Sequence, residues 1–242
     1  PFTTAKKAEK QNHRLTTPLN VSLSTIEMQL KQHSTTLLSA VQAAWLATLA
    51  HNTMTADLVF GNVVSGRTVP VPGLNELVAP CFNTIPFRLN NIHKLSFLEA
   101  FRQLQAQNVE ALPYQLTALR RIQSLANPEG KPLFDSIVLL QTSSSPLDAN
   151  IWSVEEDEGS MDLPVVVEIV PHPDTDELSV TVHVNDLPLG KEAVQDVLNT
   201  FQKFLTKALE NPRQQIIASS TDKHAFSANS LALRNKKSAK TD

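Results

Sequence analysis

Apolar residues recur with the 3.6-residue period of helices in two long segments of the chain. In the first segment the apolar stripe begins at Thr36 and contains few charged residues, which predicts a largely buried helix ending near Asn52. In the second, an amphipathic stripe predicts a helix that begins at about Lys191 and that Asn211 and Pro212 terminate. The sequence therefore predicts one buried helix and one helix with a solvated face.

Ser-x-x-Glu patterns precede two shorter helical stretches and predict capping boxes, in which the serine and glutamate side chains accept hydrogen bonds from free amide groups. The pairs are Ser24 with Glu27, before a helix over about 25–33, and Ser96 with Glu99, before a helix that runs to about Leu112. A further short helix is expected over roughly 115–125.

Short runs of β-branched and aromatic residues predict strands between these helices. The runs cover about 58–64, 84–89, 136–141, 165–170 and 178–184. A turn-rich stretch, 173–176, joins the last two and predicts a hairpin, whose second arm alternates apolar and polar residues so that one face meets solvent. The mixture predicts an α/β fold, with a sheet covered by helices on one side and partly open on the other.

The composition predicts a packed domain without a nucleic-acid or membrane surface. With 242 residues, 41% of them apolar, the chain is long enough to bury a core. Its 21 Lys and Arg against 24 Asp and Glu give a net charge of −3, which offers no basic field for phosphate backbones. Because no apolar run approaches the ~20 residues that cross a bilayer, and no signal peptide is evident, no membrane partner is expected.

The two ends of the chain and its single cysteine give further expectations. Residues 1–14 are polar and Lys-rich and predict a flexible lead-in, residues 15–217 are expected to form the ordered part, and 218–242 predict a disordered linker. One cysteine, Cys81, excludes an internal disulfide framework and favours a reducing, cytoplasmic location. Because the chain begins with Pro1, we expect it to be a piece excised from a longer protein.

The seven histidines do not have the spacing of a metal site, because none is followed at i+4 by another histidine or flanked by the cysteine that zinc sites use. His172 and His183 share the predicted hairpin, but its register sets Val166 opposite His183 and leaves the two histidines too far apart for one metal. No metal ligand is therefore expected. A Gly-x-Ser-x-Gly nucleophile elbow and a Walker-type phosphate loop are also missing from the sequence.

Three segments, in order and spacing, resemble successive motifs of the condensation domains of nonribosomal peptide synthetases. They are DLVFGNVVSGR at 57–67, LVAPCFNTIPFRL at 77–89 and PLFDSIVLLQ at 132–141. The resemblance extends over about 15–216 and implies a lobe with the chloramphenicol-acetyltransferase-like fold, a mixed sheet with helices on one face. The Asn-Thr-Ile-Pro form of the second motif and the segment LPYQLTALRRIQ look most like fungal siderophore synthetases, which build hydroxamate iron chelators.

One family motif is missing, and its absence defines which part of the domain the chain resembles. Condensation domains have two similar lobes, and the His-His-x-x-x-Asp-Gly motif with the active-site histidine belongs to the N-terminal lobe. This chain has no adjacent histidine pair, so it resembles the C-terminal lobe, and no catalytic residue is expected in it. The resemblance implies amide-bond formation between thioester substrates on peptidyl carrier proteins, in hydroxamate siderophore biosynthesis. This lobe would supply one wall of the substrate tunnel.

The resemblance also implies the partners. These are the N-terminal lobe, the carrier proteins and the adenylation domain of the parent synthetase. No cofactor is expected to bind directly, since the phosphopantetheine arms arrive on the carriers. The isolated chain is expected to be inactive.

Arg67 is the residue that we expect to support the interlobe active site, together with Ser65 and Gly66, which precede it. A guanidinium stays charged and can hold a carboxylate through two hydrogen bonds. The resemblance implies that Arg67 meets the aspartate of the missing motif. The alternative is a surface arginine after a strand.

Asn83, Thr84 and Gln141 are the candidates for the substrate tunnel. Asn83 could equally be a structural cap, and a hydrogen bond from Gln141 to the backbone is the simpler use of that side chain. Arg88 and Tyr114 are expected to be structural, with Tyr114 packed against its surroundings.

Two other functions stay open at this point. The chain could be a non-catalytic module that docks carrier proteins or stabilises a neighbouring domain. A free-standing acyltransferase acting on coenzyme A thioesters is the second alternative, against which the missing active-site histidine argues.

Overall fold

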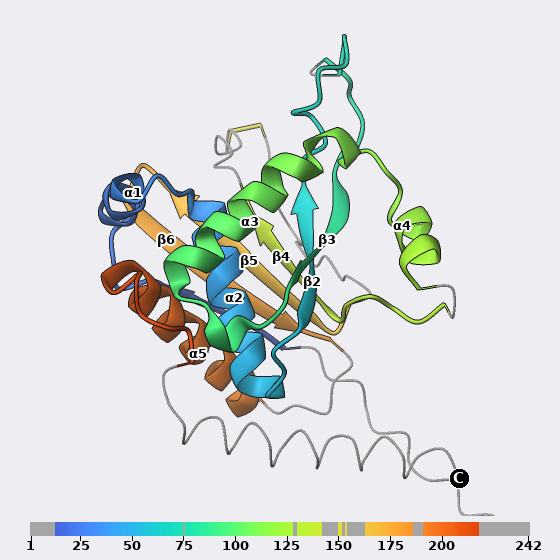
Figure 1. Cartoon of the computed structure of the whole chain (residues 1–242). Coiled ribbons are helices and arrows are strands. Elements are labelled where there is room, and N and C mark those ends of the chain that lie inside the picture. Colours follow the sequence, from blue (N-terminus) through green and yellow to red (C-terminus); the bar gives the residue numbers. More distant parts are fainter. Residues whose placement is uncertain are drawn as a thin grey trace, which may run out of the picture.

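The computed structural model describes residues 13–74, 76–127, 130–141, 150–151, 153, 163–185 and 191–217. The linker predicted over 218–242 and most of the predicted lead-in lie outside these residues. The elements, in chain order, are β1 His13–Pro18, α1 Leu23–Gln32, α2 Leu37–Thr53, β2 Leu58–Val64, β3 Asn83–Leu89, η1 Ile92–Lys94, α3 Phe97–Ala111, η2 Leu112–Tyr114, α4 Leu119–Ala126, β4 Ser136–Leu140, β5 Val165–His172, β6 Glu177–Val184 and α5 Lys191–Glu210 (Figure 1).

The strands form one mixed sheet in the order β1-β6-β5-β4-β2-β3. β4 lies parallel to both β2 and β5, and the remaining neighbours are antiparallel. The β5–β6 hairpin has the predicted register, with Val166 opposite His183. β3 ends the strand order at one side, and its Pro86 pairs with Gly61 of β2.

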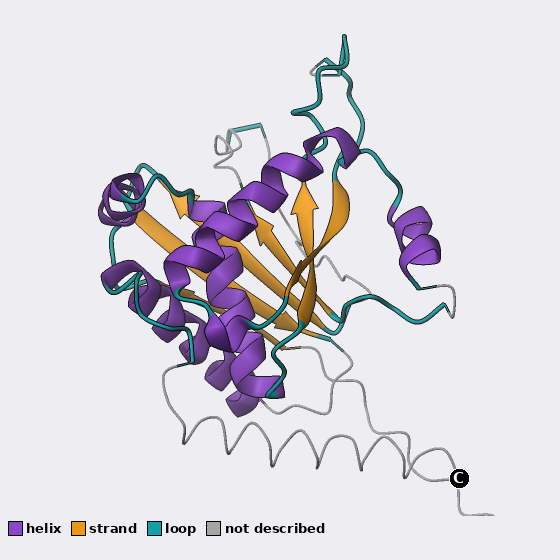
Figure 2. Cartoon of the chain, viewed as in Figure 1, coloured by secondary structure: helices purple, strands orange, loops and turns teal. Residues whose placement is uncertain are grey.

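Helices α2, α3 and α5 cover one face of the sheet, as Figure 2 shows with the helices in front. Alternate residues of each strand face this layer and form the main core, for example Val180 and Val182 of β6, both 0% exposed. Among the described residues, the opposite face carries a small apolar cluster around Phe134, Ile137 and Val166, against which the first residue of α4, Leu119, also packs. This is the predicted α/β arrangement.

Helix α2 runs through the centre of the protein because it is apolar on every side. Its start is capped by the side chain of Thr36, which accepts a hydrogen bond from the backbone amide of Ser39. Trp45 is 1% exposed, and its indole N–H donates to the hydroxyl of Ser136 on β4 at 3.2 Å. The prediction of a largely buried helix is confirmed.

The capping prediction is right for α3 and wrong for α1. In α3, Ser96 and Glu99 form both hydrogen bonds of a capping box. In α1 the cap is Ser22, whose hydroxyl accepts from the amide of Thr25. Ser24 instead donates from its hydroxyl and its amide to the carboxylate of Asp176, in the turn between β5 and β6.

The first strand begins two residues before Leu15, the point at which order was expected to start. β1 pairs with β6 along its full length, from His13 opposite Val184 to Pro18 opposite Ser179. Its residues alternate between half-buried and exposed, which gives a weak apolar pattern. Within the part of the chain that the structure describes, no helix is long and apolar enough to cross a membrane.

Candidate functional site

The three motif segments meet at one end of the sheet. The loop 65–82 leaves the end of β2 and returns at the start of β3, while Gln141 directly follows β4, which is parallel to β2. In Figure 1 this loop extends from the top of the sheet, beside the last turn of α3 and η2. The topology therefore brings together the positions of Arg67, Asn83 and Gln141, which are far apart in the sequence.

Gly66 allows the loop to fold closely upon itself. Its φ angle is +67°, in the left-handed region that side chains with a Cβ avoid. A Cβ at this position would also overlap the carbonyl oxygen of Cys81, at the other end of the loop. The glycine is thus required both by its own conformation and by its neighbour.

Arg67 holds the interior of this loop through three backbone carbonyls. Its Nη1 donates to the oxygen of Leu74 at 2.8 Å, and its Nη2 donates to those of Leu77 and Ala79 at 3.0 and 2.9 Å. Ser65 accepts a long hydrogen bond from the amide of Arg67, at 3.4 Å. These contacts use three of the five N–H groups of the guanidinium. The interlobe role of Arg67 stays a prediction, and its three carbonyl partners could not be predicted from the sequence.

Asn83 ties the start of β3 to the segment after α3. Its Nδ2 donates to the backbone oxygens of Gln115 and Thr117, at 2.8 and 2.7 Å. Gln115, which is 7% exposed, accepts a further hydrogen bond from the hydroxyl of Thr68 through its own side chain. The structural cap is therefore the use that the contacts of Asn83 support. Gln115 was not predicted, because only the folded loop shows what its side chain meets.

An amide network lies beneath the same end of the sheet. Gln42 of α2, which is 0% exposed, donates from Nε2 to the side-chain oxygens of Asn62 on β2 and Asn108 on α3, at 3.1 and 3.2 Å. Asn108 returns a hydrogen bond to Gln42 at 2.7 Å. The network links the two helices to the strand that carries the first motif, five residues before Arg67.

Thr84 and Gln141 lie on the face of the sheet that α2, α3 and α5 leave uncovered. Thr84 pairs with Val63, which packs against the small apolar cluster of that face. Gln141 donates from Nε2 to Oε1 of Glu168 on β5, at 2.8 Å. The prediction that the Gln141 side chain donates to the backbone is wrong. The parallel pairing of β4 and β5 places the carboxylate of Glu168 beside Gln141, and the amide donates to it instead.

Glu168 also contacts His183 of β6, with 3.3 Å between Oε2 and Nε2. The hydrogen bond from His183 holds the pKa of the Glu168 carboxyl below its usual value, and partial burial opposes this effect. The hydrogen bond from Gln141 and electrostatic attraction to His183 and Arg14 lower the same pKa further. The carboxylate is therefore ionised at neutral pH. Neither Glu168 nor His183 was predicted as a site residue, since both depend on the order of three strands.

Apolar side chains are exposed around the loop 65–82. We call them the apolar rim, and they are Val71, Leu77, Val78, Phe82, Leu112, Tyr114 and Leu116. Val78 is fully exposed, Phe82 is 69% exposed and Tyr114 is 63% exposed. The prediction that Tyr114 is packed is thus wrong. Exposed apolar side chains gathered around one loop are typical of a surface that another protein surface covers.

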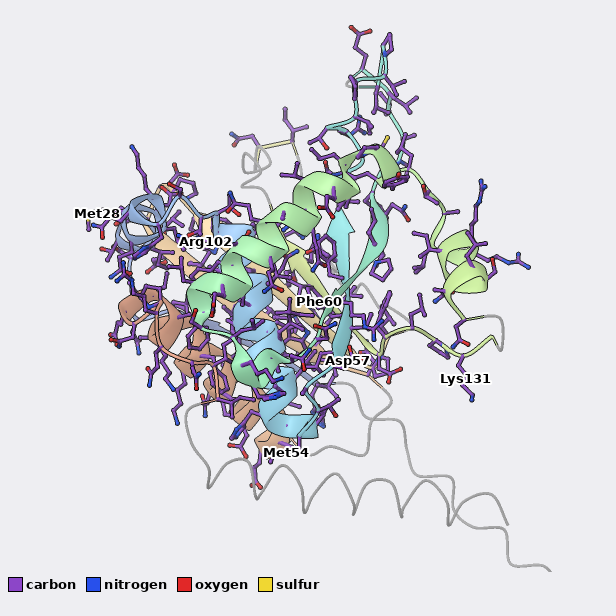
Figure 3. The ribbon with its side chains drawn as sticks, in the orientation of Figure 1. Met28, Met54, Asp57, Phe60, Arg102 and Lys131 are labelled. Atoms are coloured by element: carbon purple, nitrogen blue, oxygen red, sulfur yellow. The ribbon has the colours of Figure 1, made fainter. Side chains whose placement is uncertain are left out.

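Two other predicted features can be placed. Arg88 is structural, because its guanidinium forms a two-pronged ion pair with Asp57, at 2.8 and 2.6 Å. Figure 3 shows Asp57 at the end of the sheet away from the loop 65–82. Among the described residues, no three His, Cys, Asp or Glu side chains gather into a group that could hold a metal.

A sequence model of the condensation domain family matches residues 2–226. Nonribosomal peptide synthetase 2 of Gibberella zeae is 39% identical over 208 residues, which are 86% of this chain and 4% of that protein. The hydroxamate-type ferrichrome siderophore peptide synthetase of Schizosaccharomyces pombe is 33% identical over 163 residues, 67% of this chain and 3% of that protein. The chain thus spans a small fraction of these relatives.

Solved structures show the same fold. A four-domain nonribosomal peptide synthetase bound to AMP and glycine superposes with a TM-score of 0.73 at 18% identity, over 86% of this chain and 17% of that one. The condensation domain of the Monacolin K polyketide synthase MokA superposes with a TM-score of 0.70 at 19% identity, over 85% of this chain and 49% of that one. At these identities the likeness concerns the fold alone.

Proposed function

We propose, since this chain belongs to the condensation domain family, that it is the C-terminal lobe of a condensation domain in a nonribosomal peptide synthetase. The parent enzyme would transfer an acyl or peptidyl group from the thioester of one carrier protein to the amine held on another, and so form an amide bond. Relatives such as the ferrichrome synthetase support hydroxamate siderophore assembly as the pathway class. The family membership itself was predicted from the three motifs and is confirmed.

The observation that carries this proposal is the convergence of the three motif segments at one end of the sheet. There they surround an exposed apolar rim and adjoin the uncovered sheet face. A surface of this composition is suited to contact a second lobe, with a substrate tunnel between the two. The loop around Arg67 and the side chains of Thr84 and Gln141 would form one wall.

The part of the fold that superposes on a solved condensation domain supports the half-domain interpretation. The chain superposes on 49% of the MokA condensation domain, and its 242 residues contain no adjacent histidine pair. We infer that the proton-handling histidine comes from the other lobe, which also brings the aspartate expected opposite Arg67. The loop carbonyls leave the Nε–H and one Nη1–H of Arg67, and either group could donate a single hydrogen bond to a carboxylate oxygen.

The remaining assignments follow from this role. Carrier proteins would bring their phosphopantetheine arms into the tunnel, and the chain itself would bind no cofactor. The adenylation domain of the same synthetase would load the carriers. A cytoplasmic location fits the single cysteine, Cys81, which needs no oxidising compartment.

The test is amide formation with loaded carrier proteins, measured by mass spectrometry for the intact parent domain and for this chain alone. We expect product from the intact domain and none above buffer from the isolated chain. Product from the isolated chain would contradict the half-site interpretation. An intact domain that binds carriers without forming product would support the docking module instead.

A further inference from the structure

Glu168 occupies the centre of the uncovered sheet face. Because side chains alternate along strands, Glu168 shares this face with the residues paired to it, Leu139 on β4 and Thr181 on β6. Val166 and Val170 flank it along β5 for the same reason. Apart from Gln141 and His183, which contact the carboxylate, its neighbours named here are short or apolar, and only 19% of the Glu168 side chain is exposed.

Two donors hold the carboxylate, one on each oxygen. Gln141 donates to Oε1 at 2.8 Å and His183 contacts Oε2 at 3.3 Å. An ionised carboxylate can accept about four hydrogen bonds, so acceptor capacity remains on both oxygens. Gln141 carries no charge, and His183 brings a positive charge to Oε2 only when its imidazole is protonated.

The nearest fixed positive charge acts only through space. Arg14 of β1 lies opposite His183 in the sheet and influences Glu168 electrostatically, but within the described part of the chain it forms no ion pair with it. Among the described residues, no lysine or arginine contacts this half-buried carboxylate, and a further cationic partner would offset the cost of burying its charge. The geometry thus leaves a place for a small positively charged group.

Apolar surface adjoins this place. Ile137 and Val166 belong to the small apolar cluster of the same face, and Val166 immediately precedes Glu168 on that face. An anion beside an apolar patch is complementary to a ligand that joins a positive charge to an aliphatic body. A protonated aliphatic amine has this chemistry.

We propose that Glu168, between Gln141 and His183, binds the protonated amine of the substrate that accepts the acyl group. This inference rests on the proposed function, which places the uncovered face against the substrate tunnel. It assigns Glu168 a direct substrate contact and makes Gln141 and His183 positioning residues that orient its carboxylate. The bound ammonium would pass its proton to the imidazole that we assign to the other lobe, and the free amine would then attack the thioester carbonyl. The C–N bond would form as the C–S bond breaks and the carrier thiol leaves.

A purely structural role is the competing explanation, since the same hydrogen bonds tie together β4, β5 and β6. The variant must therefore remove the charge and keep the shape. Glu168→Gln does so, because the amide retains an oxygen for one donor and the length of the side chain. Glu177→Gln is the matched control, an exposed glutamate of β6 whose carboxylate bonds the nearby Thr175 hydroxyl.

The first experiment varies the concentration of an aminoacyl-pantetheine acceptor with the intact parent domain. Glu168→Gln is expected to raise KM for the acceptor by about tenfold, the usual effect of losing a hydrogen bond to a charged group, with kcat and the donor KM little changed. Glu168→Asp should recover part of this loss, and Glu177→Gln should behave as wild type. An unchanged acceptor KM in Glu168→Gln overturns the inference.

The second experiment uses NMR on the wild-type chain and does not depend on turnover. L-Alanine methyl ester, a protonated amine, should shift amide resonances of residues 166–170 and 181–185, and N-acetyl-L-alanine methyl ester should not. No amine-specific shift overturns the inference even if the parent domain is active. A parent domain that forms no amide would overturn the proposed function, while the amine-specific shifts would still decide on the subsite.

Discussion

Arg67 and Gly66 act together on the loop 65–82. The left-handed φ of Gly66 lets the chain pass close to the carbonyl of Cys81. The guanidinium of Arg67 then donates hydrogen bonds to the carbonyls of Leu74, Leu77 and Ala79. Because a guanidinium presents donors in a rigid plane, it fixes the relative positions of the three carbonyls. The loop is therefore shaped from within before any other lobe reaches it.

Arg67→Ala in the intact parent domain should reduce amide formation by about a hundredfold, because small displacements of positioned groups have effects of this size. The cause would be the loss of both the loop contacts and the interlobe carboxylate contact. Arg67→Lys should recover little, since an ammonium cannot bind several carbonyls in one plane. Initial rates with loaded carriers measure the effect.

Arg88→Ala is the control for this prediction, because it also removes an arginine with a two-pronged contact, but at the other end of the sheet. We expect a near-normal rate from it, since exposed ion pairs stabilise proteins little. A near-normal rate from Arg67→Ala as well would show that Arg67 is not required.

Alanine substitutions at Gly66 and Gly73 distinguish the cost of backbone strain from the cost of steric overlap. Both have positive φ, but a Cβ on Gly73 would meet nothing within 4 Å, whereas one on Gly66 would overlap the Cys81 carbonyl. Gly73→Ala should therefore lower the free energy of unfolding by about 1 kcal/mol, and Gly66→Ala by clearly more. Urea denaturation measures both, and equal losses would show that the loop moves aside.

The sequence identified Arg67 through its motif, but it could not reveal what the guanidinium binds. Backbone carbonyls carry no sequence signal, and those of Leu74 to Ala79 come within reach only after the loop has folded. The same holds for Asn83, for which a cap and a tunnel contact were equally open until its two carbonyl partners were seen.

At the scale of elements, a local sequence pattern predicted the structure correctly where its residues bond to neighbours in the sequence. The capping box of α3 lies within four residues, and the sequence predicted it. The apparent box of α1 failed because Ser24 is taken by Asp176, 152 residues away. β1 was not predicted as a strand for a related reason. Its apolar and polar residues alternate only weakly, and its pairing with the distant β6 cannot be seen in the local sequence.

The α3 capping box should make stability depend on acid pH. Hydrogen bonds from the hydroxyl and amide of Ser96 lower the pKa of Glu99 from the ordinary 4.5. A lowered pKa in the folded state means that the stabilisation is complete well above 4.5 and is lost as the pH falls through the folded pKa. Glu99→Gln should remove this part of the pH dependence, because glutamine can still accept from Ser96 but does not titrate.

The measurement is the free energy of unfolding from neutral to acid pH. Glu110→Gln, in the last turn of the same helix and outside the cap, is the control for loss of one negative charge. If Glu99→Gln and the wild type showed the same decline in acid, the box would contribute nothing to it.

At the scale of the whole molecule, the element order and the layers were predictable, while the Gln141–Glu168–His183 group was not. The helices and most strands follow from apolar period, and the motif resemblance added the fold, which the solved structures confirm. The side-chain group requires β4, β5 and β6 to be neighbours. No local pattern encodes that adjacency.

If this chain is half of a domain, the apolar rim should bind the other half. We expect the preceding lobe of the parent domain, expressed separately, to associate with this chain and to raise its melting temperature. Val78→Asp should weaken the association by about tenfold, because it places a charge in the contact. Titration calorimetry measures the affinity.

Met28→Asp is the matched control, since Met28 is 57% exposed and Figure 3 shows it on α1, away from the loop 65–82. It should leave the affinity unchanged. Equal binding by Val78→Asp and the wild type would place the interlobe contact elsewhere on the chain.

Pro86 affects whether this chain, separated from a second lobe, would aggregate through the edge of its sheet. It lies in β3, the last strand of the sheet, where a row of unpaired backbone groups would otherwise invite strands from other copies. A proline there has no amide hydrogen to offer, and the neighbouring Arg88 adds charge along the same border. Growth of the sheet into fibrils is thereby discouraged at this side.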